Sequence, residues 1–164
     1  MKRVSRLILA MGLLLTFGLF ALGSGESSTT DDQGSGNSEV SETKANLGDY
    51  NIEIKSCRLA TDYEGKKVVI VNYGYTNYSE NASSFMTAVT TTVYQNSVGL
   101  NEAYVLDDSA NYSGDNQTKE IKTGASLDVE VAYELNDEVT DIEVEVKEWI
   151  SFNDSVVTKT FTIV

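Results

Sequence analysis

Histidine and proline are absent from this sequence of 164 residues, which has one cysteine, Cys57, and one tryptophan. A Ser-His-Asp or Cys-His catalytic unit needs histidine, and a zinc site needs several histidine and cysteine ligands, so both are excluded. The single cysteine excludes an intrachain disulfide. Basic residues are few, 12 against 25 acidic ones, and the formal charge of −13 argues against nucleic-acid binding. We therefore expect no cofactor and no nucleic-acid partner, and charge repulsion favours a soluble monomer.

The N-terminus has the pattern of a secretory signal peptide. Three basic residues come within the first six positions, and the apolar run from Leu7 to Leu22 has only one polar residue, Thr16. Ala21 and Gly23 then supply small residues at the −3 and −1 positions of a cleavage site. We expect residues 1–23 to be removed as a signal peptide. An uncleaved membrane anchor is the alternative, because the run falls just short of the ~20 residues that span a bilayer.

The residue that follows this signal is Ser24, and the only cysteine lies far downstream. A bacterial lipoprotein signal ends in a small residue followed by the cysteine that receives the lipid. The segment LFALGS therefore resembles such a motif with serine in place of the acceptor, and a serine hydroxyl is a very weak nucleophile at neutral pH. We expect secretion, or location at the extracellular face of the cell envelope, without a lipid anchor. Membrane contact would then come only from an uncleaved signal.

Residues 24–46 form a polar segment that is rich in serine, threonine, glycine and acidic residues. Val40 is its one large apolar residue. Such a segment cannot bury enough apolar surface to offset its ordering entropy, so it predicts a disordered linker. The remaining residues, 47–164, are enough for one domain with its own core.

From residue 47 onward, apolar residues recur at every second position, which is typical of β-strands. The clearest runs are LDVEVAYEL from Leu127 and DIEVEVKEW from Asp141, with turn residues between them. The other expected strands are Tyr50–Leu59, Lys67–Thr76, Phe85–Tyr94, Ala103–Leu106, Thr118–Ile121 and Val156–Ile163. About eight short antiparallel strands predict an all-β fold with two packed sheets and almost no helix beyond the signal. A closed barrel is the alternative.

The alternation divides each strand into a core face and a solvent face. The expected core residues are Ile52, Ile54, Leu59, Val69, Val71, Tyr73, Phe85, Val89, Val93, Val129, Val131, Tyr133, Val144, Val146, Phe161 and Ile163. Four acids of the two clearest runs are expected to face water: Glu130, Glu134, Glu143 and Glu145. These charges would also deter edge-to-edge aggregation of the sheets. A bulge after Ile54 would bring Cys57 to the core side as a small buried hydrophobe.

Several motifs of the domain resemble those of a small family of Firmicute surface proteins. They are DYEGK at Asp62–Lys66, YTNYS at Tyr75–Ser79, SFM at Ser84–Met86, KEIKTGAS at Lys119–Ser126 and VTKTFTI at Val157–Ile163. The family comprises secreted proteins and lipoproteins with a domain of unknown function. The resemblance implies an immunoglobulin-like β-sandwich at the cell surface, and it implies no activity. Thr123 stands where the family has a turn proline, and Ser24 where it has the lipid-acceptor cysteine.

The segment DDSANYSGDNQTKE, residues 107–120, partly resembles a calcium-binding loop. The candidate ligands are Asp107, Asp108, Asn111, Asp115 and Glu120. Aligned on an EF-hand from Ser109, the segment has serine where aspartate is expected, few carboxylates and no flanking helices. An ordinary polar loop between strands is therefore the preferred interpretation, and no metal is expected.

Aromatic residues at strand ends and in loops are the candidates for a binding surface. They are Tyr78, Tyr104, Tyr112 and Trp149. Loop tyrosines beside asparagine and serine are common in the binding surfaces of sandwich domains, although tyrosine also packs well within strands. Trp149 lies on the polar phase of its strand, so it is either exposed or placed beyond a bulge. An exposed tryptophan would be a strong anchor for a partner.

These features together predict a non-enzymatic binding module, extracellular or at the cell surface, with an unknown protein or glycan as its partner. A carbohydrate- or calcium-dependent surface-binding protein is the first alternative. A hydrolase that uses the strand carboxylates is the second, and it would need two of them to face each other across a cleft.

Overall fold

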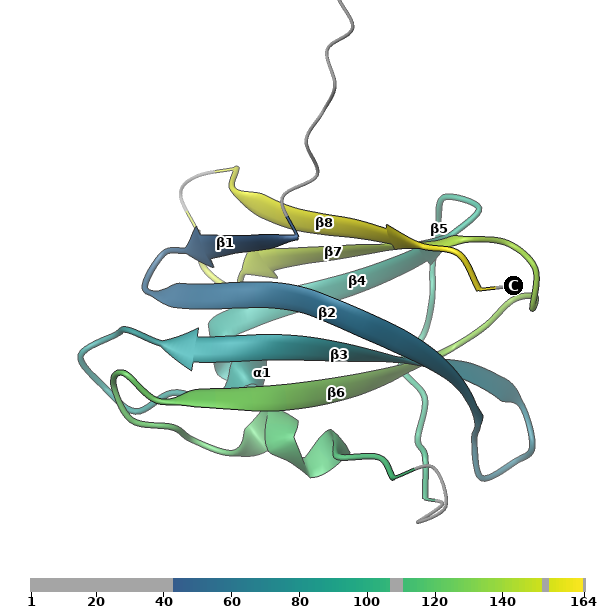
Figure 1. The fold of residues 1–164 in the computed structure, drawn as a ribbon, viewed down its shortest axis with the longest axis horizontal. Coiled ribbons are helices and arrows are strands. Elements are labelled where there is room, and N and C mark those ends of the chain that lie inside the picture. Colours follow the sequence, from purple (N-terminus) through teal and green to yellow (C-terminus); the bar gives the residue numbers. More distant parts are fainter. Residues whose placement is uncertain (1–42, 107–110, 152–153, 164) are drawn as a thin grey trace, which may run out of the picture. The chain divides into compact units, whose positions relative to one another are not determined.

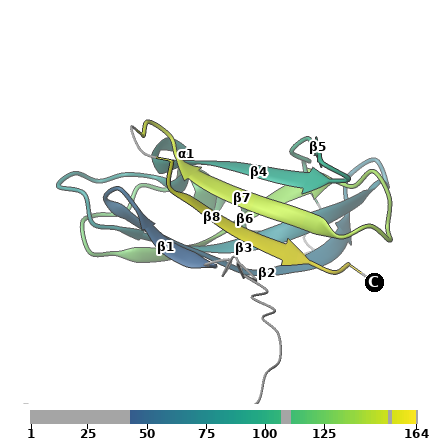
Figure 2. The same ribbon diagram turned by 90° about the horizontal axis from the view of Figure 1, so that it is seen from above.

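The computed structural model describes residues 43–106, 111–151 and 154–163. Its strands form two four-stranded sheets, in the orders β1-β2-β3-β6 and β5-β4-β7-β8, and every pairing is antiparallel. The elements are β1 (Lys44–Leu47), β2 (Tyr50–Thr61), β3 (Lys67–Asn77), α1 (Phe85–Ala88), β4 (Val89–Gln95), β5 (Val98–Gly99), η2 (Gly114–Thr118), β6 (Ser126–Glu134), β7 (Ile142–Glu148) and β8 (Val156–Phe161). Figures 1 and 2 show the sheets as two stacked layers. The predicted all-β sandwich is confirmed, and a closed barrel is excluded by the two separate sheets.

The main core lies between the sheets and uses the alternating apolar residues of each strand. All but two of the expected core residues are buried in it. Phe161 is only partly buried, and Leu59 is 46% exposed. Leu59 keeps the predicted phase, but it lies at the turn end of the β2–β3 hairpin, where the hairpin runs past β8 (Figure 1). The alternation pattern therefore predicted correctly that Leu59 points to the core side. It could not predict that the second sheet does not cover this end of β2.

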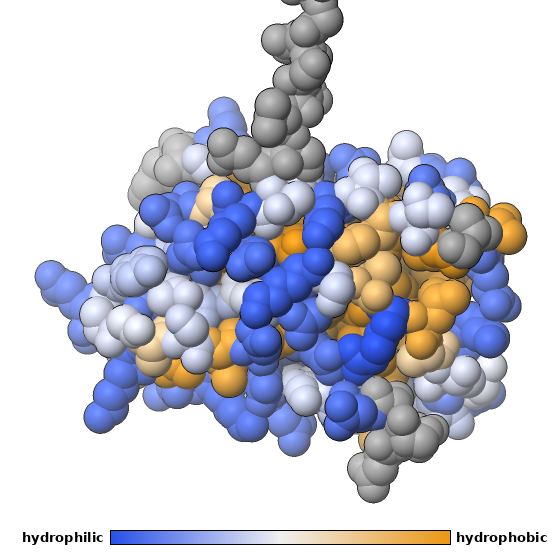
Figure 3. Space-filling view, in the orientation of Figure 1, coloured by the Kyte–Doolittle hydropathy of each residue, from blue (hydrophilic) through white to orange (hydrophobic). Residues whose placement is uncertain are grey.

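A second apolar cluster buries the outer face of the first sheet. Val68 and Ile70 of β3 and Ala132 of β6 lie in this cluster, and Val105 from the chain between β5 and β6 covers them. Figure 3 looks at this face and shows apolar residues gathered over the turn half of β2 and β3, with hydrophilic residues over most of the rest. Because β3 is buried on both faces, its apolar residues are nearly continuous in sequence.

The first strand begins at Lys44, inside the segment that its composition assigns to a linker. β1 pairs with β2 over its whole length, and Leu47 at its end is almost completely buried in the main core. The tight turn to β2 contains Gly48, whose φ of 57° is unfavourable for other residues. The short strand KANL has only one large apolar side chain, which is why composition alone does not reveal it.

The expected strand Phe85–Tyr94 is partly wrong, because its first four residues form the short helix α1. Ser84 precedes the helix, and its backbone N–H donates to Thr87 Oγ1 at 3.3 Å, as in a capping box. After Ala88 the chain becomes extended and continues as β4. The core residues Phe85 and Val89 were predicted correctly even though the element between them was not.

The expected strands Ala103–Leu106 and Thr118–Ile121 are also wrong. The first region contains no strand residue, and only its neighbour Glu102 forms an isolated bridge, to Tyr133. The second contributes one isolated bridge, Ile121 to Ser83. Part of the second region belongs to the 3-10 helix η2. Short alternating pairs of apolar residues are too weak a pattern to separate a strand from a chain that crosses a sheet edge.

The predicted bulge in β2 is confirmed, since the register with β3 shifts between Ile54 and Ser56. Cys57 consequently packs against the main core and is partly buried, which raises the pKa of its thiol. Lys159 of β8 donates to the carbonyl oxygens of Ile54 and Lys55, at 3.1 and 2.7 Å. The lysine therefore links the second sheet to the bulge in the first.

Candidate functional site

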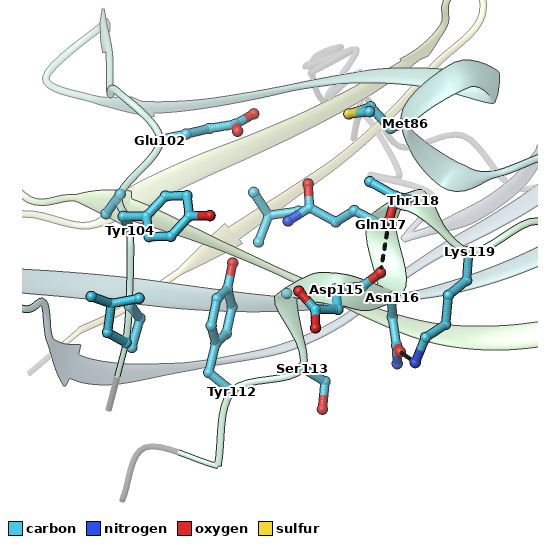
Figure 4. A pocket seen from close by; sticks show the side chains of 15 residues that line it. Met86, Glu102, Tyr104, Tyr112, Ser113, Asp115, Asn116, Gln117, Thr118 and Lys119 are labelled. Atoms are coloured by element: carbon cyan, nitrogen blue, oxygen red, sulfur yellow. Dashed lines mark hydrogen bonds between the residues drawn. The ribbon is translucent and has the colours of Figure 1, made fainter. Parts of the chain in front are cut away.

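A cavity of about 660 Å³ opens beside β6, the edge strand of the first sheet. Two parts of the chain between β5 and β6 line it, residues 102–106 and 112–119, together with Met86 of α1 and Val131 of β6 (Figure 4). Its lining mixes aromatic, aliphatic, amide and carboxylate side chains. Small-molecule and peptide sites in proteins commonly combine an apolar surface with a few polar groups in this way.

Main-chain hydrogen bonds to the β6 edge hold the first of these segments. The Ala103 N–H donates to the Ala132 carbonyl at 2.8 Å, and the Glu134 N–H donates to the Asn101 carbonyl at 2.9 Å. These two bonds add one bridge to the sheet, at Glu102. Glu102 and Tyr104 therefore project from a segment that is fixed to a sheet edge.

Polar side chains hold the second segment against β6. Asn116 in η2 donates from its amide nitrogen to the Asp128 carbonyl at 2.8 Å. The Ser113 N–H donates to Glu130 Oε2 at 2.9 Å. The edge of β6 is thus covered by the two segments that form the cavity, which protects it from pairing with another chain.

Arg58 and Glu130 form a bidentate ion pair beneath this second segment. The guanidinium of Arg58 donates to both carboxylate oxygens, through Nη1 to Oε1 and through Nη2 to Oε2 at 3.1 Å. Nη2 also donates to the Asn111 carbonyl at 3.2 Å. Burial raises the pKa of the Glu130 carboxyl, but Arg58 and the Ser113 N–H lower it by more, so it lies below its ordinary value.

The prediction that Glu130 faces water is therefore wrong. Its side chain points to the outer face of the sheet as alternation requires, yet the residue is only 9% exposed because residues 111–113 cover it. The other three strand acids stay accessible at least in part, and they lie on two different sheets, Glu134 on β6 and Glu143 and Glu145 on β7. These four acids do not face one another across a cleft.

Tyr112 forms one wall of the cavity and packs on the outer apolar cluster. Its ring lies so close to Gly114 that a methyl group at that position would overlap it, so glycine is needed for close approach. Burial raises the pKa of the Tyr112 hydroxyl, the Ala132 backbone and Gln117 lower it, and the negative charge of Glu102 raises it again. Tyr104 is 74% exposed at the same cavity.

A family model described as Domain of unknown function (DUF5067) matches residues 25–148 of the chain. The chain belongs to this family. No curated protein matches it.

Two solved structures are similar to this DUF5067 protein. An NMR structure of a protein from Enterococcus faecalis is 18% identical, with a TM-score of 0.57, and the match covers 74% of this chain and 90% of that one. The yjhA protein from Bacillus subtilis is 10% identical with a TM-score of 0.49, over 70% of this chain and 93% of that one. At 18% identity the likeness to the Enterococcus faecalis protein concerns the fold alone.

The structure brings two of the four candidate binding residues of this DUF5067 domain together. Tyr104 and Tyr112 line the cavity, whereas Tyr78 and Trp149 do not. Tyr78 follows β3 and is 59% exposed, and its N–H donates to the Asp49 carbonyl at 2.8 Å. Trp149 follows β7 and is 61% exposed, which decides between the two alternatives left open by the sequence.

The candidate calcium loop is only partly within the described residues, since Asp107 and Asp108 lie outside them. The carbonyl of Asn111 accepts from Arg58, Asp115 lies in the first turn of η2, and Glu120 is exposed after that helix. Across residues 43–106, 111–151 and 154–163, no group of three or more acidic or cysteine side chains is placed to hold a metal ion.

Most of the cavity lining was not expected from the sequence, including Met86 and Glu102. Nothing in their local pattern marks them, because they come together only when α1 and the chain between β5 and β6 meet beside β6. Within the part of the chain that the structure describes, no helix is long and apolar enough to cross a membrane. The apolar run Leu7–Leu22 lies outside those residues.

Proposed function

We propose that this DUF5067 domain is a non-enzymatic binding module that takes its ligand in the cavity beside β6. The observation that carries the proposal is that Tyr104 and Tyr112 both line this cavity, on segments that hydrogen bonds fasten to a sheet edge. Tyrosines supply a large contact surface at a low cost in conformational entropy. Binding residues on loops that a rigid scaffold positions are common in sandwich domains.

The strand order supports an immunoglobulin-like assignment of the fold. In such domains strands A, B and E form one sheet, and strands G, F, C and C′ form the other. Here β2, β3 and β6 correspond to A, B and E, and β8, β7, β4 and β5 correspond to G, F, C and C′. The bridge at Glu102 then occupies the place of strand D, beside E. Under this assignment the cavity lies where strand D has been replaced by the binding segments.

We also propose that the protein is exported and carries no lipid anchor. The basic start, the apolar run and the small residues before Ser24 support export, and the serine cannot form the thioether of a lipoprotein. Mass spectrometry of the protein from cells tests this, with an unmodified N-terminal amine at or after Ser24 as the expected result. A diacylglyceryl mass would contradict it, and an intact Met1 would indicate an uncleaved anchor. Ser24→Cys should convert the protein to a membrane-bound lipoprotein.

The binding function is tested by thermal melting of the full-length protein with cell-envelope glycans, peptides and calcium. A ligand of the native state raises the melting temperature by mass action. The expected result is a ligand whose effect is lost in Tyr104→Ala and kept in Tyr78→Ala, since both tyrosines are exposed but only Tyr104 lines the cavity. If every ligand acts equally on both variants, the cavity is not the site. Hydrolase activity that disappears with the strand carboxylates would contradict the non-enzymatic assignment.

A further inference from the structure

Glu102 gives the cavity a negative charge that forms no ion pair within the described residues. It lies at the bridge to Tyr133, so the sheet edge fixes its backbone. Figure 4 shows the Glu102 carboxylate and the hydroxyl ends of Tyr104 and Tyr112 directed into the same space. A carboxylate and two phenol hydroxyls are therefore directed into the same part of the cavity.

The charge of Glu102 acts on the tyrosines around it. Burial is the main cause of the raised pKa of Tyr112 and of the pKa of about 12 at Tyr133, and Glu102 raises both further. The hydroxyl of Tyr133 is held inside the core by its hydrogen bond to Thr91 Oγ1, at 2.8 Å. The carboxylate therefore makes the space beside Tyr112 more negative, which favours a bound cation there.

The remaining charges of the lining favour a cation over an anion. Asp115 is exposed in the first turn of η2 and adds a second negative charge. Lys119 donates its ammonium to Asn116 Oδ1 at 2.7 Å, at the far side of the cavity from Glu102 (Figure 4). The formal charge of −13 on the whole chain repels anions and attracts cations over a longer range.

Apolar side chains complete the cavity next to these charges. Met86 supplies a flexible thioether, and Val105 and Val131 supply aliphatic surface. A ligand with a charged head and a hydrocarbon stem can use both parts of such a lining. A cavity of about 660 Å³ has room for a stem of several methylene groups.

We propose that the cavity binds a protonated alkylamine. The ammonium group lies between the Glu102 carboxylate and the hydroxyl groups of Tyr104 and Tyr112, and the alkyl stem packs against Met86 and Val105. This ligand class rests on the proposed binding function. The shared chemistry is a primary ammonium on a methylene chain, which either a lysine side chain of a peptide or a free polyamine provides.

The test is titration of the full-length protein with a tetralysine peptide and, separately, with spermidine, followed by calorimetry and amide NMR. The expected result is binding that weakens with added salt and shifts the signals of residues 102–104 and 115–117. Tighter binding of the peptide assigns a lysine side chain, and tighter binding of spermidine assigns a polyamine. Failure of both probes at low salt overturns the ligand class.

Matched variants separate the site from general attraction to an acidic protein. Glu102→Gln should weaken binding about tenfold, whereas Glu143→Gln removes the same charge from an exposed position on β7 and should leave the affinity unchanged. Equal losses in the two variants would show unspecific attraction and would overturn the inference.

The ligand class and the binding function can fail separately. Binding of a neutral oligosaccharide, such as chitotetraose, that depends on Tyr104 and not on Glu102 would overturn the alkylamine and leave the binding module intact. A full ligand screen in which Tyr104→Ala changes nothing would overturn the binding function itself.

Discussion

The carboxylate of Glu130 joins three separate parts of the chain. It binds Arg58 of β2 across the sheet and accepts from the Ser113 N–H, and Arg58 in turn holds the Asn111 carbonyl. Removing one member of such a network lowers the stability of the folded state, because the remaining charge loses its partner and stays shielded from water. The cavity wall that contains Tyr112 therefore depends on a pair of residues that do not line the cavity.

Arg58→Met is expected to lower the free energy of unfolding by about 2 kcal/mol, because it leaves the Glu130 carboxylate buried and unpaired. Lys44→Met is the matched control, since Lys44 pairs with Glu53 at 3.2 Å on the exposed surface. It should cost less than about 1 kcal/mol. Urea unfolding of both variants measures the difference, and equal losses would contradict the role assigned to Arg58.

The depressed pKa of Glu130 predicts how its contribution depends on pH. The folded-state pKa of Glu130 lies below its unfolded-state pKa, which is about 4.3. The stabilisation is therefore fully present above the unfolded-state pKa and is lost as the pH falls through the folded-state pKa. The difference in unfolding free energy between the wild type and Glu130→Gln should therefore shrink as the pH falls below about 4. Unfolding curves at several pH values measure it, with Glu143→Gln as the control for loss of one charge. A difference that grows toward acid pH would contradict this.

At the scale of elements, β1 shows that a strand need not carry a strand-like sequence. Its four residues KANL contain one large apolar side chain, yet Leu47 is almost completely buried and the strand pairs along its whole length. A domain boundary placed at residue 47 would remove three of the four residues that pair with β2. The stability of the domain edge then rests largely on the burial of Leu47.

Leu47→Ala is expected to destabilise the protein by about 3 kcal/mol, because it empties a buried position in the main core. Leu59→Ala makes the same chemical change on β2 at a residue that is 46% exposed, so it should cost about 1 kcal/mol or less. Thermal or urea unfolding of the two variants gives the comparison. If Leu47→Ala costs as little as Leu59→Ala, β1 is not part of the cooperative core.

At the scale of the whole molecule, two features bear on how the chain folds. Sheets with non-local antiparallel pairing, such as β3 with β6 and β4 with β7, form slowly because distant segments must meet first. The sequence contains no proline, so the slow isomerisation of X–Pro bonds that delays many proteins is absent.

Refolding of the full-length protein from urea should therefore finish within milliseconds to seconds, without the slow phase of about 10–100 s that proline isomerisation causes. Stopped-flow fluorescence of Trp149 and the tyrosines follows the reaction, and varying the time spent unfolded should not change the amplitudes. A prolyl isomerase should have no effect. A slow phase that grows with time in the unfolded state would contradict the expectation.

The sequence by itself determined the long strands, their core faces and the bulge after Ile54. These features follow from local patterns, because a strand that is buried on one face must place an apolar side chain at every second residue. The patterns failed where the chain is short or covers a sheet edge, as at α1 and at residues 101–106, since a few alternating residues fit a helix turn, a bridge or a strand equally well.

Only the tertiary structure decided which residues share the cavity. Met86, Glu102, Tyr104 and Tyr112 come from segments that have no common pattern, and they meet because the chain between β5 and β6 crosses the edge of β6. The same part of the chain buries Glu130. The alternation of β6 placed Glu130 correctly on the outer face of the sheet, but it could not reveal which residues cover that face. Strand periodicity reports the direction of a side chain along its own strand, whereas a binding site depends on contacts between distant parts of the chain.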